Sequence, residues 1–332
     1  IVTLDRLKRI EIEPDYETWK EYAYKKGVHA SVMTYLAARK KDFYKIENAA
    51  DGKHFVTARG WDDLSEMIKL YEENGLAVDE QLICQYLQDA RISKDFAIYY
   101  DLFNKYRSDY QVEKILDGTV SESIVLRAER ASMDERLSLL GLIFDSVTAQ
   151  LRTVCERENI LDLVTGQLKT LKEKLKDVSG AAALLSEMIK AEREKLERGK
   201  QSSSISPQTQ RETRFMLEYL EEFRAAVMQS GTAQKDEFSV VRESFAQKVA
   251  ELKGLAADGG RALENVFSFC EKAFADGDEI LIFVTELTAN YYSARFIGRY
   301  GCDRYYMHNK QLQFDQRQQE IIKRMDEIQW TV

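Results

Sequence analysis

The chain has 332 residues, of which 44% are hydrophobic, so it can build about two domains with buried cores and is not a disordered tail. Charged residues make up 31% and only two prolines occur, a composition that favours long, exposed helices. The net charge of −8 argues against broad electrostatic binding of nucleic acid, and no apolar run approaches the roughly 20 residues that span a bilayer. We therefore expect no nucleic-acid partner and no membrane span.

The cysteines are far apart, at Cys84, Cys155, Cys270 and Cys302, and no pair has the spacing of a zinc finger or a redox motif. The three histidines are equally scattered. We expect no metal site, and we expect reduced, mostly buried thiols in a cytoplasmic protein. The chain starts with Ile1 rather than Met, so we expect its true N-terminus to lie upstream.

The first elements have clear start and stop signals. Residues 4–14 begin as a helix end and become an alternating strand, which Pro14 ends because it cannot donate to a ladder. Asp15 is a plausible N-cap for a helix over 16–26, and Gly27 ends that helix.

Further signals follow up to about residue 115. The Asp51-Gly52 pair predicts a β-hairpin within 43–57. Asp79 predicts the start of another helix. The remaining helices expected in this part cover 30–39, 61–74 and 94–105.

The rest of the chain, 116–332, has an almost entirely helical pattern, and we expect an elongated helical bundle or a long helical hairpin. Gly180 predicts a bend, and the Ser-rich stretch 199–208 predicts a loop in which Ser206-Pro207 starts the next helix. The later helices are expected over 207–229, 233–256, 259–275 and 279–329, the last broken near 298–302.

The most informative motif is the segment 55–65 (FVTARGWDDLS), which places Arg59 at the start of an amphipathic helix. Guanidinium is permanently charged and suits phosphate geometry. Trp61 and Leu64 can anchor the helix face, while Asp62 and Asp63 suit its first turn. The alternative is a helix-start arginine that pairs only with a local carboxylate.

This segment resembles the sensor-2 segment of MoxR-type AAA+ ATPases, and the resemblance extends over about the first third of the chain. It includes Leu4-Asp5-Arg6, the strand to Pro14, the Trp19 helix, the hairpin before Thr57, the stretch 78–83 and Asp95-Phe96-Ala97. It implies that residues 1–115 are the end of an AAA+ core and its helical lid. In this family the sensor-2 arginine reaches the phosphates of a nucleotide held by another domain, which implies a nucleotide-binding role for Arg59.

A second residue is implicated by the same resemblance. Arg6 in Leu4-Asp5-Arg6-Leu7 matches the arginine finger that stabilises charge on the phosphoryl group of a neighbouring subunit. The chain has Leu7 where the family usually places Phe, and three residues are a weak motif. Arg6 is the candidate catalytic residue, and a solvated surface arginine is the alternative.

No G-x-x-x-x-G-K-[ST] phosphate loop occurs anywhere in the chain. The stretch 281–286 looks like a Walker B strand, but Thr285 precedes Glu286 where Asp is needed, and the stretch lies C-terminal to the sensor. We interpret it as the start of a buried helix. ATP and Mg²⁺ are therefore expected in the parent chain, not bound to this fragment, and the fragment alone should not hydrolyse ATP.

Three other patterns have simpler explanations. Residues 276–279 (DGDE) lack the ligands of a calcium loop, so they indicate a turn and helix cap. The aromatic run from Phe96 to Tyr110 has helical spacing and indicates a packed interface between lid and tail rather than a nucleic-acid platform. His308 near Cys302 indicates a packed helix break rather than a cysteine hydrolase.

The resemblance implies a parent protein that forms a hexameric ring and acts as a chaperone-like remodeller, often with a von Willebrand factor A-domain partner. The lid would sense the nucleotide state and the helical tail would contact a partner or client. Two alternatives stay open. One is a helical adaptor or scaffold with no nucleotide role, and the other is a small-molecule enzyme with a helical pocket.

Overall fold

The computed structural model describes residues 13–49, 52–176, 180–202, 204–231, 237–275 and 277–310. Within these ranges the protein is mainly α-helical, with one small antiparallel sheet, which confirms the predicted fold class at this level. The predicted strand over 4–14 lies almost entirely outside the described residues.

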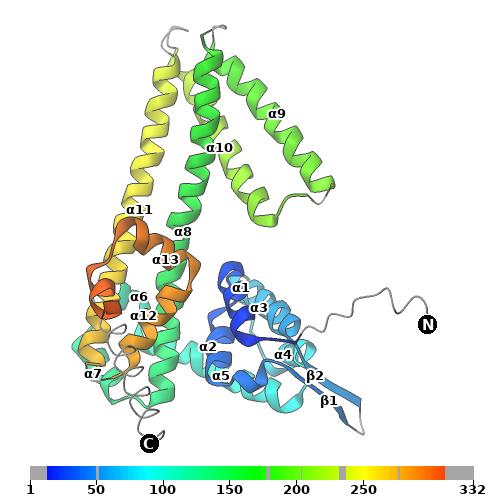
Figure 1. Cartoon of the computed structure of the whole chain (residues 1–332), viewed down its shortest axis with the longest axis vertical. Helices are drawn as coiled ribbons and strands as arrows, with labels where there is room; N and C mark the ends of the chain where they lie inside the picture. Colours follow the sequence, from blue (N-terminus) through cyan, green and yellow to red (C-terminus); the bar gives the residue numbers. More distant parts are fainter. Residues whose placement is uncertain are drawn as a thin grey trace, which may run out of the picture. The chain divides into compact units, whose positions relative to one another are not determined.

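The elements are drawn in Figure 1. In the first 116 residues they are α1 (Tyr16–Lys26), α2 (Ala30–Ala38), η2 (Lys40–Asp42), β1 (Lys45–Ala49), β2 (Gly52–Val56), α3 (Ala58–Glu73), α4 (Glu80–Tyr86), α5 (Ala90–Tyr110) and α6 (Val112–Leu116). The later elements are α7 (Glu122–Arg130), α8 (Met133–Lys174), α9 (Ala181–Gln201), α10 (Pro207–Ser230), α11 (Glu237–Ala273), α12 (Glu279–Ala289) and α13 (Tyr291–Tyr300). A further helical segment covers 303–310.

The described residues form two compact units. Unit 1 takes the described residues of 1–148 and 262–294, together with 302–310. Unit 2 takes those of 149–261 and 295–301, so α8 and α11 supply residues to both units. The predicted division near residue 115 stays a prediction.

The core of unit 1 includes the helices α1 to α5. The hairpin β1–β2 pairs Ile46 with Phe55, and a single bridge joins Phe55 to Gln88, two residues after the end of α4. Phe96 and Phe103 of the aromatic run on α5 are buried, so this run is packed, whereas the predicted interface between lid and tail stays a prediction. Large side chains filling this core include Trp19, Tyr35, Phe43, Trp61, Leu64 and Ile68.

Unit 2 is built on α9 and α10, which pack along each other, together with parts of α8 and α11 (Figure 1). Its core includes the fully buried Leu171, Leu185, Leu220, Phe223 and Val241. An elongated helical bundle or a long helical hairpin was expected over 116–332, and the structure confirms the helical character of the described part of this range.

Local cap signals located several helices correctly. The Asp15 carboxylate accepts from the amide of Thr18 at 2.7 Å, and Gly27 adopts the left-handed conformation that ends α1. The Ser206 hydroxyl caps α10, with Pro207 in its first turn. The two hairpin strands are also confirmed, although Asp51 lies outside the described residues.

Other boundaries differ from the prediction. α11 runs without a break through Gly259 and Gly260, where a break between two helices was expected. The reason is packing, because a Cβ at Gly259 would lie 3.2 Å from Leu151 and 3.6 Å from Phe296. α9 continues to Gln201, so the loop predicted over 199–208 is shorter than expected.

The prediction of a last helix over 279–329 was also wrong in one respect, because the helix breaks at Asn290. The Asn290 side-chain oxygen accepts from the amides of Tyr292 and Ser293 and so starts α13. The break expected near 298–302 is confirmed, since α13 ends at Tyr300. The stretch 281–286 lies in helix α12, as interpreted; Phe283 and Val284 are buried, whereas Thr285 is exposed. Residues after 310 lie outside the described part.

Among the described helices, α8 alone is long and apolar enough by length and composition to cross a membrane. Its most apolar 18-residue stretch has a mean hydropathy of 1.2, and 56% of that stretch is buried inside the structure. That pattern also fits the core helix of a folded protein, so it is weak support for a span.

Glu158 is the main buried charge of unit 2. Its carboxylate is 2% exposed and receives Arg295 at 3.2 Å and Arg299 at 3.0 Å, and the Tyr300 hydroxyl also donates to it. These contacts tie α8 to α13 within the unit.

Replacing Glu158 by Ala should destabilise the protein by about 3 kcal/mol, because it removes the buried carboxylate that binds both Arg295 and Arg299. The matched control is Glu197→Ala, since Glu197 is 61% exposed and pairs with Lys200 on the surface, which should cost less than about 1 kcal/mol. Urea unfolding of the two variants measures the difference. Equal midpoints would show that the Glu158 contacts do not stabilise unit 2.

Candidate functional site

Arg59 lies in the first turn of α3, and its side chain is 89% exposed. Its one ion pair in the described structure joins Nε to Asp63 Oδ2 at 3.4 Å, one helical turn further on. Asp63 is itself 51% exposed, and such surface pairs contribute little free energy. The guanidinium is therefore available to an anion that approaches the start of the helix.

The backbone that carries Arg59 is held firmly. The Thr57 hydroxyl accepts from the amide of Gly60 at 3.2 Å, and this cap explains why α3 begins at Ala58, three residues before the predicted start. A Cβ at Gly60 would lie 2.8 Å from the backbone oxygen of Tyr86. Only glycine permits this close approach of α3 to the end of α4.

Trp61 fixes the same turn from the inside. Its side chain is fully buried, and its indole Nε1 donates to the backbone oxygen of Asp42 at 3.3 Å. The Asp42 carboxylate is buried and receives the Tyr35 hydroxyl at 3.0 Å and Arg91 at 2.8 Å. The role of Asp42 was not predicted from the sequence. No local pattern indicates that its backbone oxygen accepts a hydrogen bond from Trp61 in the first turn of α3.

The two aspartates after Trp61 have different partners. Asp62 is bound by Lys26 and by the Tyr22 hydroxyl of α1, and only Asp63 faces Arg59. The second oxygen of Asp62 is buried and has no hydrogen-bond partner in the described part of the chain. Asp62 therefore attaches α3 to α1 and leaves Arg59 free to face outward.

The hairpin is attached to α5 through Asp89. Its carboxylate caps α5 by accepting from the amides of Arg91 and Ile92, and it receives Lys45 of β1 at 2.8 Å. Burial alone would raise the pKa of Asp89, but Lys45 and the two amides outweigh burial and hold that pKa below its usual value.

Arg6, the predicted arginine finger, lies outside the described residues, so the structure does not place it relative to Arg59. Both assignments stay predictions. Within the described ranges, no group of three or more His, Cys, Asp and Glu side chains is placed to hold a metal ion.

Cys302 and His308 are not arranged as nucleophile and base. The Cys302 thiol donates to Glu264 at 3.3 Å, whereas His308 faces Glu271 at 3.0 Å. Burial, together with the neighbouring carboxylate of Glu264, raises the pKa of Cys302 to about 12. The thiol is thus protonated at neutral pH, as expected for a packed residue.

Comparisons with known proteins identify no homologue of this chain. No protein family, no curated protein and no solved structure matches this chain.

Replacing Gly60 by Ala should destabilise unit 1 by about 1–3 kcal/mol, because the new methyl group meets the backbone oxygen of Tyr86. Gly254→Ala is the matched control, since Gly254 lies in α11 with open space around its Cα. That change should be neutral or stabilise by up to about 1 kcal/mol. Thermal unfolding followed by circular dichroism measures the shift in unfolding temperature for each variant. A shift in the same direction in both variants would contradict the close packing of Gly60 against Tyr86.

Replacing Asp89 by Asn keeps the helix cap and removes the charge that faces Lys45, so it should destabilise the protein by about 1 kcal/mol at pH 7. The folded-state pKa of Asp89 lies below its unfolded value of about 3.9, so the charge stabilises above that value. The contribution is lost as pH falls through the folded-state pKa. The difference in unfolding free energy between wild type and variant should therefore shrink below about pH 4, and a constant difference down to pH 2 would contradict this.

Proposed function

We propose that this chain is the C-terminal part of a MoxR-type AAA+ ATPase, in which residues 1–115 are the end of the core and the lid. Residues 116–332 then form the elongated helical tail. The proposal is supported by the resemblance in the first third of the chain and by the position of Arg59. The single observation that carries it is the exposure of Arg59 on a rigid helix start, with a side chain that is 89% exposed.

A sensor arginine needs a fixed backbone and a side chain that can change partner. Thr57, Gly60 and Trp61 supply the fixed backbone. The weak pair with Asp63 supplies the exchangeable partner, because a phosphate accepts two parallel hydrogen bonds from the guanidinium fork. Arg59 would leave Asp63 and bind the phosphates of a nucleotide held by an upstream domain.

The other roles follow from the same family. Arg6 would act as the arginine finger toward a neighbouring subunit of a hexameric ring. ATP and Mg²⁺ would bind the upstream domain, and this fragment alone would not hydrolyse ATP, since its sequence has no phosphate loop. The lid would pass the nucleotide state to the tail, which would contact a client or a von Willebrand factor A-domain partner in the cytoplasm.

The complete gene product tests this proposal. Arg59→Ala should lower the rate of ATP hydrolysis about tenfold or more, because a charged hydrogen bond to phosphate is lost. Arg59→Lys should recover part of the rate, since it keeps the charge and loses the fork. Phosphate release measures the rate in each case.

Arg261→Ala is the matched control, because Arg261 is also an exposed helical arginine paired with a local aspartate, Asp258. It should leave ATP hydrolysis unchanged. An ATPase whose rate is insensitive to Arg59→Ala would contradict the sensor role. A complete gene product that binds no ATP would contradict the whole proposal and favour a helical adaptor.

A further inference from the structure

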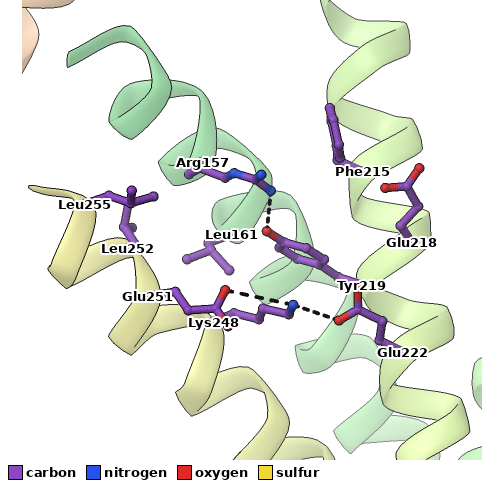
Figure 2. Close-up of a pocket in the computed structure, with 10 residues that line it drawn as sticks. All are labelled: Arg157, Leu161, Phe215, Glu218, Tyr219, Glu222, Lys248, Glu251, Leu252 and Leu255. Atoms are coloured by element: carbon purple, nitrogen blue, oxygen red, sulfur yellow. Dashed lines mark hydrogen bonds and ion pairs between the residues drawn. The ribbon is translucent and has the colours of Figure 1, made fainter. Parts of the chain in front are cut away.

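Unit 2 contains a hollow of about 290 Å³ between α8, α10 and α11, shown in Figure 2. This volume is at the small end of the range for ligand pockets. The apolar part of its wall is formed by Leu161, Leu252, Leu255 and Phe215. No motif in the sequence marks the hollow, because its residues come from three separate helices.

Arg157 of α8 is the most unusual residue of the hollow. It is half-buried, and its Nη1 donates to the Tyr219 hydroxyl at 2.6 Å. Its guanidinium also lies 5.3 Å from the ring centre of Phe215 and 6.0 Å from that of Tyr219. Across the residues that the structure describes, no carboxylate forms an ion pair with Arg157.

The second cation of the hollow is already neutralised. Lys248 of α11 binds Glu222 at 2.7 Å and lies 3.9 Å from Glu251, and its ammonium sits 4.6 Å from the ring centre of Tyr219. Arg157 and Lys248 thus share the Tyr219 side chain, but only Lys248 has acidic partners (Figure 2). An anion that enters the hollow would meet Arg157 as its available cation.

A half-buried charge without an ion-pair partner is costly, and guanidinium has five N–H donors, of which the Tyr219 hydroxyl takes one. A carboxylate accepts two parallel hydrogen bonds from such donors, as a phosphate does, and it brings less negative charge into a hollow that Glu218, Glu222 and Glu251 also line. Leu161 of α8 and Leu252 and Leu255 of α11 line the same hollow and offer an apolar surface to the group that carries the carboxylate.

We propose that this hollow binds a carboxylate joined to a small apolar group, with Arg157 receiving the carboxylate and Leu161, Leu252 and Leu255 receiving the apolar group. The carboxylate belongs either to a free organic acid or to the C-terminus of a peptide that ends in an apolar residue. This inference does not rest on the nucleotide role of Arg59, because all the residues that line the hollow belong to unit 2.

Ligand-observed NMR with the full chain tests the site, using 3-phenylpropionate, its neutral amide and phenethylamine as probes. The acid should bind, and the amide should bind about tenfold more weakly or not at all, because it lacks the charge that Arg157 requires. Glu218, Glu222 and Glu251 also line the hollow, so the amine tests the opposite preference. Tighter binding of the amine, or no binding of the acid, would overturn the proposal.

Two variants separate binding from folding. Arg157→Gln should weaken binding of the acid about tenfold, while Arg157→Lys should retain part of it. Arg193→Gln is the matched control in the same unit, because Arg193 already pairs with Glu221. Helicity measured by circular dichroism checks that each variant is folded, and equal affinity of Arg157→Gln and wild type would overturn the role of Arg157.

The source of the carboxylate is decided by a second comparison. A tetrapeptide that ends in leucine is titrated with a free and with an amidated C-terminus. Binding of the free form but not of the amidated form would assign the site to peptide C-termini. Binding of 3-phenylpropionate alone would assign it to small organic acids, and binding of neither ligand would overturn the proposal.

Discussion

The burial of Trp61 is the constraint on which the region around Arg59 depends. The indole is fully buried in the core of unit 1 and donates to the backbone oxygen of Asp42. The first turn of α3 therefore cannot rotate or slide without exposing a large apolar surface. Gly60 then has to lie against Tyr86, and Arg59 has to point outward. The burial of Trp61 therefore both fixes the position of Arg59 and keeps the charge of Arg59 exposed.

Much of the fold could be predicted because its signals are local. A cap such as Asp15 or Ser206 acts within one turn, and a left-handed Gly27 ends a helix whatever the rest of the chain does. The same is true of the hairpin, whose two strands are close in sequence. The placement of Arg59 at a helix start was predictable for this reason, although the role of Thr57 as its cap was not recognised.

The errors arise where distant contacts outweigh local preference. Gly259 and Gly260 weaken a helix by their own propensity, yet Gly259 lets α11 approach Leu151 and Phe296, and the helix continues. The hollow around Arg157 was missed for a related reason, because Arg157 and Tyr219 are 62 residues apart and meet only in the folded unit. The pattern of a single sequence does not show which distant residues come into contact.

We propose that Arg59 belongs to a lid that serves a nucleotide domain. The coding sequence upstream of Ile1 tests this most directly. We expect this sequence to encode a strand followed by G-x-x-x-x-G-K-[ST] and then a Walker B strand, which would make Arg59 and Arg6 testable nucleotide contacts. A start codon immediately upstream, with no phosphate loop, would contradict it and would leave a helical binding module without a nucleotide to sense.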